Sequence, residues 1–260
     1  MAGKRVSTAV GEPLAEQHAR FLQQAAWTAA LRRYVWGRLR LPPRARVLEV
    51  GCGTGAVTQT LHDYAQITTF GLDLHLPSLR FAQSQDPATR FCAADAHALP
   101  FSTDSFDAAA CHFLLLWVAH PEQVLREMAR VCRAGGTVLA LAEPDYGGRI
   151  DYPPPLIEIG RLQAAALQAQ GADPLAGRKL SGWLHAAGLT AIETGVLGGQ
   201  WSGPPSPAAW QSEWDTLASD LAGQISPEAL AELKRIDQQA WQDGRRVLFV
   251  PTFYGLGTKA

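Results

Sequence analysis

Hydrophobic and polar positions follow two different periods along the chain. Short apolar or β-branched runs predict strands at residues 45–50, 67–73, 89–94, 106–112, 136–143, 189–197 and 246–259. Between them the apolar residues recur with helical spacing, which predicts helices at 13–39, 55–64, 77–83, 121–132, 156–170 and 174–187. In the helix at 121–132, Pro121 suits the first turn, and Val124, Leu125, Met128 and Val131 form one apolar face.

Strands that alternate with helices predict parallel βαβ units. We therefore expect an α/β fold, with a doubly wound, mostly parallel sheet of seven strands and helices on both faces. An N-terminal helical segment would occupy residues 1–40, and the main domain would occupy 41–260. A helical insert is expected at about 201–243, because Ser206-Pro207 and Ser226-Pro227 each place a capping residue before a proline.

The strongest local signal is the stretch from Val47 to Gly55, which reads Val-Leu-Glu-Val-Gly-Cys-Gly-Thr-Gly. Its strand runs through three alternating glycines toward a helix, and glycines allow a sharp turn and close approach of a ligand. The helix that follows would offer unpaired N–H groups to an anion. Because the same stretch also fits the G-x-G-x-x-G/A fingerprint of dinucleotide-binding proteins, the loop alone leaves the cofactor open.

Glu49 separates these two interpretations. A carboxylate two residues before the first glycine would repel a pyrophosphate, but it can pair with the ammonium of a methionine moiety. With that acid, the pattern Glu49-x-Gly51-x-Gly53-x-Gly55 resembles motif I of class I S-adenosylmethionine-dependent methyltransferases. The resemblance covers all but the first few dozen residues.

Later segments extend the resemblance. Asp73 ends the second predicted strand, where an acid can hold ribose hydroxyls, although it could also serve only as a helix cap. Asp95-Ala96 resembles the family motif that binds the adenine edge, and His97 beside it is either a surface residue or a cofactor contact. The resemblance implies a cofactor site made of Glu49, Gly51, Cys52, Gly53, Gly55, Asp73, Leu74, Asp95, Ala96 and His112.

The methyl acceptor would bind beyond the ends of the fourth and fifth strands, because ligands of open parallel sheets lie at the carboxyl ends of the strands. His112, Asp145 and Tyr146 stand there, and they are residue types that align a nucleophile or move a proton. Alternatively, His112 only contacts the cofactor, and the other two only shape a turn. Glu143, Asp145 and Asp151 lack the spacing of a recognised metal motif, so we expect no metal.

Two helical stripes each allow two interpretations. One helix face carries Trp210, Trp214, Leu217 and Leu221, which favours core packing over an aromatic lid on a substrate pocket. The N-terminal helix carries Arg20 and Trp27 on a face that either covers the cofactor or packs on the sheet edge.

The composition limits the kinds of binding partner that we expect. The 23 Lys and Arg residues balance 24 Asp and Glu residues, so a nucleic-acid partner is not expected. An apolar run follows the fourth strand in place of the Asn/Asp-Pro-Pro-Tyr/Phe motif of nucleobase methyltransferases, which points the same way. No apolar run reaches the roughly 20 residues of a membrane span, and no signal-peptide pattern is present, so we expect a cytoplasmic protein.

Together these features predict S-adenosylmethionine-dependent methyl transfer to a small molecule, with the acceptor and the oligomeric state left open. A catalytically silent, cofactor-binding partner subunit is the first alternative, because binding and catalysis rest on different residues. An NAD(P)-dependent oxidoreductase is the second alternative. It is less favoured, because this sequence contains no catalytic Tyr-x-x-x-Lys pair.

Overall fold

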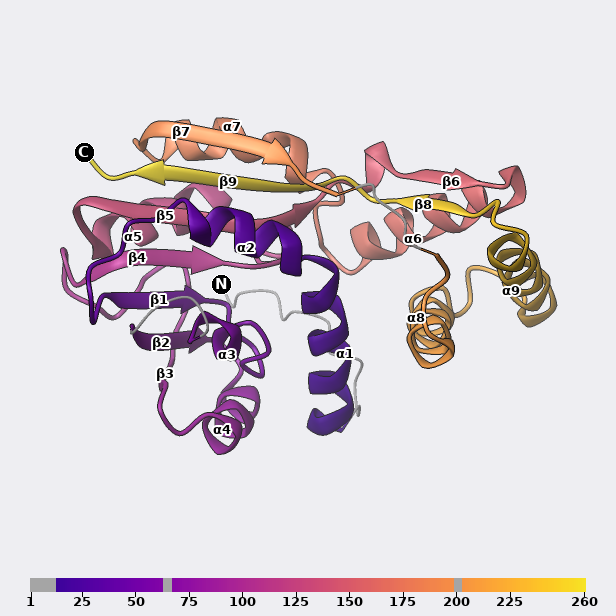
Figure 1. The fold of residues 1–260 in the computed structure, drawn as a ribbon, viewed down its shortest axis with the longest axis horizontal. Coiled ribbons are helices and arrows are strands. Elements are labelled where there is room, and N and C mark those ends of the chain that lie inside the picture. Colours follow the sequence, from indigo (N-terminus) through magenta and orange to yellow (C-terminus); the bar gives the residue numbers. More distant parts are fainter. Residues whose placement is uncertain (1–12, 63–66, 199–202) are drawn as a thin grey trace.

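The computed structural model describes residues 13–62, 67–198 and 203–260. Its main sheet has seven strands in the order β3-β2-β1-β4-β5-β9-β7 (Figure 1). Neighbouring strands from β3 to β5 are parallel, and β9 runs antiparallel to both β5 and β7. The strands are β1 (Arg46–Val50), β2 (Thr68–Asp73), β3 (Arg90–Ala93), β4 (Phe106–Cys111), β5 (Cys132–Pro144), β7 (Thr190–Val196) and β9 (Thr252–Thr258). The predicted fold class is confirmed.

Helices cover both faces of this sheet (Figure 1). They are α1 (Leu14–Trp27), α2 (Ala29–Gly37), α3 (Thr58–Leu61), α4 (Leu76–Gln85), α5 (Pro121–Val131) and α7 (Ala176–Ala186). Successive strand residues point to opposite faces. In β1, Leu48 packs in one core with α5 and α7, whereas Val47 packs in another with α2 and α3. The predicted apolar face of α5 is buried in the first of these cores. We call this sheet with its helices the large body.

A small lobe stands at one end of the large body (Figure 1). It consists of β6 (Ile150–Tyr152), α6 (Ile157–Ala169), α8 (Pro207–Asp220), α9 (Pro227–Gln242) and β8 (Val247–Phe249). Strands β6 and β8 form a separate two-stranded antiparallel sheet. Ser206 and Ser226 accept hydrogen bonds from backbone N–H groups of α8 and α9, as their cap patterns predict. Trp214 and Leu217 lie in the core of the lobe, which confirms the packing interpretation of that stripe.

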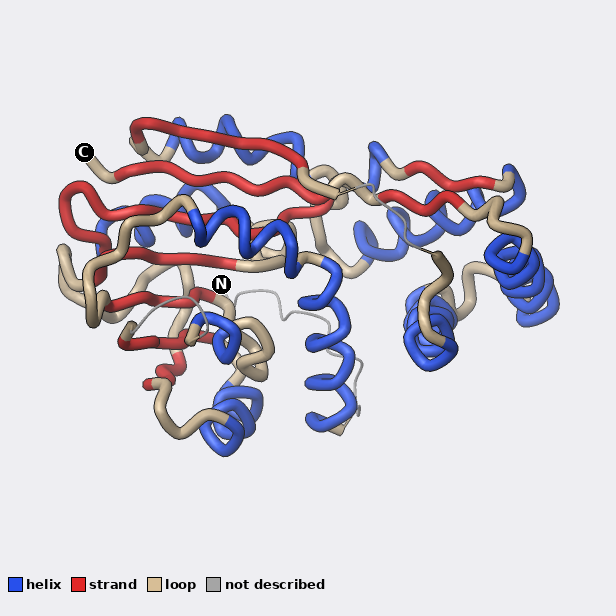
Figure 2. Tube along the Cα trace, in the orientation of Figure 1, coloured by secondary structure: helices blue, strands red, loops and turns tan. Residues whose placement is uncertain are grey.

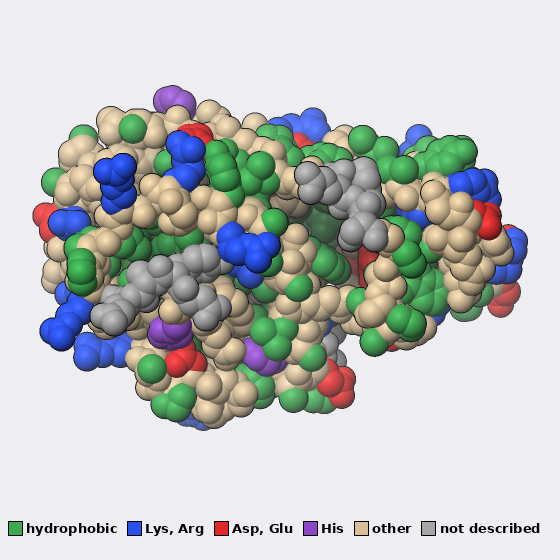
Figure 3. Space-filling model, viewed as in Figure 1, with side chains coloured by type: hydrophobic (Ala, Val, Ile, Leu, Met, Phe, Trp, Pro, Cys, Tyr) green, Lys and Arg blue, Asp and Glu red, His purple; other side chains and the backbone are tan. Residues whose placement is uncertain are grey.

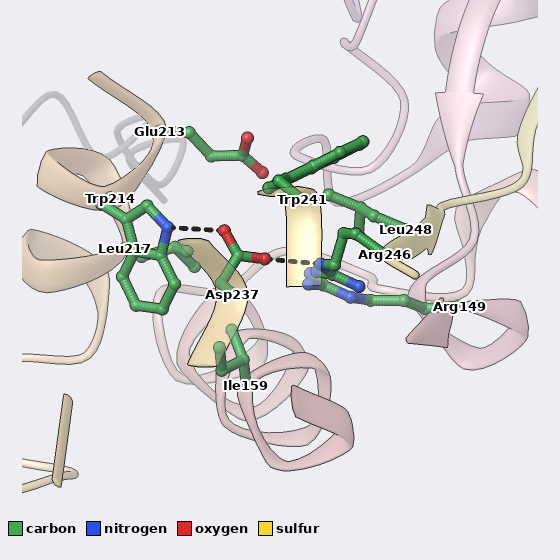
Figure 4. Close-up of a pocket in the computed structure, with 9 residues that line it drawn as sticks. All are labelled: Arg149, Ile159, Glu213, Trp214, Leu217, Asp237, Trp241, Arg246 and Leu248. Carbon is green, nitrogen blue, oxygen red and sulfur yellow. Dashed lines mark hydrogen bonds and ion pairs between the residues drawn. The ribbon is translucent and has the colours of Figure 1, made fainter. Parts of the chain in front are cut away.

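Buried charges connect the elements of the small lobe. Arg246 donates to Asp237 at 2.5 Å and to Asp151 at 2.8 Å, and all three side chains are almost fully buried. Arg149 pairs with the same Asp151 at 2.6 Å. Figure 4 shows the Asp237 carboxylate between Arg246 and Trp214, whose indole N–H donates to it at 3.1 Å. Arg246 stands just before β8 and also donates to the carbonyl of Tyr152, so the network joins β6, α8, α9 and the start of β8.

The expected single helix over residues 13–39 is wrong, because it breaks at Thr28 into α1 and α2. The Thr28 hydroxyl donates to the carbonyl of Ala25 at 3.2 Å. Such local side-chain bonds compete with the regular ladder of a helix. The break redirects the chain, so that α2 packs on the sheet while α1 leaves it (Figure 1).

The expected closing strand over 246–259 is also divided. Pro251 has no N–H to donate to a ladder, and the chain changes sheets there, from β8 to β9. Figure 2 shows this passage from the small lobe into the main sheet. Strand β6 lies in the Gly- and Pro-rich stretch 145–155, where no strand was predicted. The helix expected at 55–64 is shorter, with α3 beginning at Thr58; residues 63 and 64 lie outside the described residues.

The domain boundary at residue 40 and the insert bounds of 201–243 stay predictions, and residues 1–12 and Trp201 lie outside the description. The helices of the insert pack with α6 in one core. In the described ranges, no helix combines the length and the apolar character that crossing a bilayer requires.

Candidate cofactor and acceptor site

The glycine-rich loop after β1 adopts a backbone shape that requires its glycines. Gly51, Gly53 and Gly55 have φ angles of +75°, +52° and +82°, in the left-handed region that L side chains rarely adopt. Added Cβ atoms would also crowd the neighbours, since one at Gly51 would lie 2.7 Å from Leu114. Cys52 between them is buried, and its N–H donates to the Leu72 carbonyl at 3.0 Å. The loop is therefore a fixed backbone cradle.

Asp73 joins the tip of β2 to this loop. Its Oδ2 accepts the N–H of Gly53 at 2.8 Å, and its Oδ1 accepts the N–H of His75 at 2.8 Å. Leu74 between them is 60% exposed, although it is a large apolar residue. A carboxylate with spare lone pairs beside an exposed apolar side chain fits a ribose and the base attached to it.

Asp95 and Ala96 begin the turn after β3, next to the tip of β2. The N–H of Ala94 donates to the Asp73 carbonyl at 3.0 Å, which brings the two turns together. The Asp95 carboxylate is half-exposed, and its Oδ1 already accepts two hydrogen bonds from His97. Glu49, Asp73 and Asp95 therefore stand at the carboxyl ends of three adjacent parallel strands, in the order β1, β2, β3.

Glu49 lies deeper than the two aspartates. It is buried and accepts a short hydrogen bond from the hydroxyl of Thr58. Burial raises the pKa of Glu49 to about 8, against the opposing effects of the Thr58 hydrogen bond and the nearby Arg32. The carboxyl group is therefore mostly protonated at neutral pH in the protein alone.

Helix α1 packs against the glycine-rich loop. His18 shares a 2.9 Å hydrogen bond with the Thr54 hydroxyl, and its ring contacts that of Phe81. A Cβ at Gly53 would lie 3.3 Å from the Phe21 ring. His18 and Phe21 thus form the face that meets the loop, whereas Trp27 is 60% exposed and does not pack on the sheet edge. That the face with Arg20 and Trp27 covers the cofactor stays a prediction. His18 and Phe21 were missed because helical spacing does not say which face meets a distant loop.

His112 follows β4 and contacts the break between α1 and α2. Its Nε2 shares a 2.8 Å hydrogen bond with the Thr28 hydroxyl, which also accepts from Arg32 at 2.6 Å. Burial, reinforced by the positive charge of Arg32, lowers the pKa of His112 to about 3. The imidazole is therefore neutral at physiological pH, held against helix residues from a distant part of the chain.

Asp145 and Tyr146 follow β5 and differ in what they offer a ligand. The Asp145 carboxylate forms an ion pair with Arg178 at 2.5 Å and accepts the N–H of Gly148 at 3.2 Å. Tyr146 is half-buried, and burial raises the pKa of its phenol to about 12. Asp220 of α8 contributes to that rise, which places Tyr146 near the small lobe. Tyr146 is thus a neutral hydroxyl, and Asp145 is engaged in shaping the turn.

Glu143 has a role that the sequence did not indicate. It is fully buried and accepts backbone N–H groups of Leu114, Leu115 and Leu116 at 2.9–3.1 Å. It therefore fixes the loop after β4. The Leu114 side chain of this loop packs against Gly51 of the glycine-rich loop. Asp151 pairs with Arg149 and Arg246 in the small lobe. The three acids considered as metal ligands, Glu143, Asp145 and Asp151, therefore each have different partners. Within the described ranges, no group of His, Cys, Asp or Glu is arranged to hold a metal.

A hollow separates the large body from the small lobe on the face drawn in Figure 3, and apolar side chains are visible on its walls. Helices α1 and α8 meet across the two parts, because Gln23 donates to the Ala209 carbonyl at 2.9 Å. Arg20 of α1 also acts on Asp220, where its charge opposes the rise in pKa that burial causes. Side chains of α1 therefore interact with α8 and link the large body to the small lobe.

Comparison with known proteins agrees with this geometry. Residues 48–140 match the family model described as methyltransferase domain. The chain is 37% identical over 122 residues to the demethylmenaquinone methyltransferase of Renibacterium salmoninarum, covering 46% of this chain and 51% of that protein. It is 42% identical over 95 residues to a malonyl-acyl-carrier-protein O-methyltransferase of Pseudescherichia vulneris, covering 36% of this chain and 37% of that protein. The chain thus spans about half the length, or less, of these curated relatives.

Solved structures share the whole architecture. A chain in the complex between the Haloferax volcanii Trm112 methyltransferase activator and a methyltransferase superposes with a TM-score of 0.62 and 17% identity, covering 98% of this chain and 99% of that one. Two other structures of this fold contain S-adenosyl-L-homocysteine or S-adenosyl-L-methionine. Residues 48–140 thus match a methyltransferase domain, and the chain as a whole has the class I, Rossmann-like fold of these structures.

Proposed function

We propose that the protein transfers the methyl group of S-adenosylmethionine to a small-molecule acceptor. One observation carries the proposal. Three acidic side chains, Glu49, Asp73 and Asp95, stand in strand order at one edge of the sheet, beside a glycine-rich backbone cradle. Their order matches an ammonium, a ribose diol and an adenine amino group, which are the hydrogen-bond donors of that cofactor.

The residues of the large body fit this cofactor in detail. Glu49 would bind the ammonium, and Asp73 would accept the ribose hydroxyls with the lone pairs that Gly53 and His75 leave free. Leu74 would pack on the base, which explains why a large apolar side chain is exposed at this tip. When bound, the cofactor supplies an electrophilic methyl carbon on a sulfonium.

On the acceptor side, the protein positions groups rather than removing a proton. His112 has a pKa of about 3 and Tyr146 a pKa of about 12, so both are neutral near pH 7. A general base works best when its pKa lies near the working pH. His112 and Tyr146 would therefore orient an acceptor that is already nucleophilic, and Asp145 would hold the turn that carries Tyr146.

The apolar walls of the hollow and the contact between α1 and α8 support a small acceptor, enclosed between the two parts (Figure 3). The balanced charge of the chain gives no reason to expect a polyanionic acceptor. We therefore place the acceptor beside His112 and Tyr146, with the small lobe as its outer wall.

Calorimetric titration of the purified protein with S-adenosylmethionine, S-adenosylhomocysteine and NADH tests the cofactor first. We expect the two sulfur compounds to bind and NADH not to bind. Incubation with a metabolite extract and S-adenosylmethionine carrying a radioactive methyl group then tests transfer, read as label in a small-molecule fraction. Tight binding of NADH without a signal from either sulfur compound contradicts the proposal.

The alternative of a catalytically silent subunit has one observation in its favour. His112 has a pKa of about 3, Tyr146 has a pKa of about 12, and the Asp145 carboxylate is engaged by Arg178, so none of the three candidate groups is an obvious general base. Cofactor binding without label transfer in any extract, and with activation of a second protein from that extract, would favour this alternative.

A further inference from the structure

The turn after β3 is held rigidly by α5. The Gln123 amide donates to the His97 carbonyl at 2.9 Å, and Glu127 accepts the N–H of Leu99 at 2.8 Å. Arg130 donates to the carbonyls of Leu99 and Phe101, both at 2.9 Å. The Asp95 side chain is thus presented by a backbone fixed along its length.

The two carboxylate oxygens of Asp95 have different surroundings. Oδ1 accepts the backbone N–H of His97 at 2.9 Å and Nδ1 of the same residue at 2.7 Å. Oδ2 accepts no hydrogen bond from the described part of the chain, and the side chain is half-exposed. The backbone N–H of His97, together with its ring, holds the pKa of Asp95 below its usual range. Asp95 is therefore an ionised acceptor with one oxygen engaged and the other open.

The His97 ring has a single tautomer compatible with this contact. An ionised carboxylate only accepts hydrogen bonds, so a neutral His97 must carry its proton on Nδ1. Its Nε2 is buried and has no hydrogen-bond partner among the described residues. The ring also packs edge-on against His120, with 6.1 Å between ring centroids. The imidazole therefore acts as a fixed donor that sets the rotation of the Asp95 carboxylate.

We propose that His97 is a positioning residue that turns Asp95 so that Oδ2 meets the 6-amino group of the cofactor's adenine. The inference rests on the proposed function, and it adds a residue that selects an adenosyl over an inosyl ligand. An amino group donates to a carboxylate, whereas the 6-oxo group of hypoxanthine presents an oxygen that Oδ2 repels. His97 thus acts only through Asp95, and only on ligands that carry the amino group.

The test compares S-adenosyl-L-homocysteine with S-inosyl-L-homocysteine by calorimetry in His97→Ala. The variant removes the ring donor, so the dissociation constant of the adenosyl ligand should rise roughly three- to tenfold. The constant of the inosyl ligand should stay within about twofold, since it gains nothing from the oriented oxygen. His97→Asn keeps an N–H near the position of Nδ1 and should restore most of the adenosyl affinity.

His185→Ala, a histidine substitution on the exposed side of α7, is the matched control and should change neither constant. In an Asp95→Ala background, His97→Ala should have no further effect on the adenosyl ligand, because its partner is gone. Equal weakening of both ligands in His97→Ala would refute the proposal, since it would mean general damage to the turn. Unchanged constants for both ligands would refute it too. If the wild type binds neither ligand, the proposed function itself fails.

Discussion

The large body and the small lobe both bury carboxylates, but they satisfy them with different partners. In the large body, backbone N–H groups are the partners of the buried Glu143, which holds the loop after β4, and of the partly exposed Asp73, which holds the glycine-rich loop. In the small lobe Asp151 and Asp237 are bound by two arginines and by tryptophan N–H groups. A carboxylate on the backbone fixes the path of a loop, whereas a side-chain network fixes how helices and strands pack.

The difference has a consequence for ligand binding. Asp73 lies at a strand tip and keeps lone pairs beyond those used by Gly53 and His75, so we propose that it both shapes a loop and binds a ligand. In the small lobe the buried carboxylates instead pair with arginines, as Figure 4 shows for Asp237 and Arg246. We therefore expect substitutions in the network to act on stability and substitutions at the strand tips to act on affinity.

The largest expected effect is on the small lobe. Arg246→Ala leaves Asp151 and Asp237 buried without their shared partner, and breaking a buried pair costs about 3–5 kcal/mol. Urea unfolding, followed by tryptophan fluorescence, measures the loss. Arg245→Ala is the matched control, because Arg245 pairs with Asp243 at the surface, where ion pairs contribute little to stability. Similar unfolding free energies for the two variants would contradict the structural role of the network.

Asp73→Ala should act mainly on affinity. The change removes the acceptors for the ribose hydroxyls, and hydrogen bonds to a charged group contribute about 1.5–3 kcal/mol each. The dissociation constant of S-adenosylhomocysteine should therefore rise at least roughly tenfold, as measured by calorimetry. Asp104→Ala, at an exposed aspartate paired with Lys259, is the control and should leave the constant unchanged. A folded Asp73→Ala protein with unchanged affinity would reduce Asp73 to a structural cap.

A smaller effect, less than tenfold per pH unit, is expected from Glu49. Its raised pKa of about 8 keeps it protonated in the free protein, and pairing with an ammonium requires the ionised form. Binding should therefore release up to one proton, so affinity for S-adenosylhomocysteine should increase from pH 6 to pH 7. Calorimetry in two buffers of different ionisation enthalpy counts the proton. Glu49→Gln should release none, and equal proton release from both proteins would exclude Glu49 as its source.

No effect is expected from metal removal. Glu143, Asp145 and Asp151 are bound by backbone N–H groups or arginines, and these partners would have to be displaced before the acids could bind a cation. Label transfer to the acceptor fraction should be the same with and without EDTA. Activity lost in EDTA and restored by magnesium would contradict this, and these acids would then be the first ligands to test.

The sequence predicted the order and type of elements well where one period dominates. Strands β1 to β4 and helix α5 lie within one or two residues of their expected bounds, because each buries its own apolar face. The predictions were wrong where a single residue redirects the chain, at Thr28 and at Pro251. Pro251 ends a strand for a local reason, yet only the two sheets show that the chain continues in a second one.

By itself, the sequence determined the backbone shape of the candidate cofactor site and the place of its acids, whose roles toward the cofactor stay predictions. Glycines with positive φ and acids at strand tips follow from backbone geometry, which is encoded locally. Tertiary structure alone decided the rest. It brought His18 onto Thr54, Thr28 onto His112 and Glu143 onto the loop after β4. These contacts join segments that are 28 to 84 residues apart, and no local periodicity records which distant partner a buried polar group will meet.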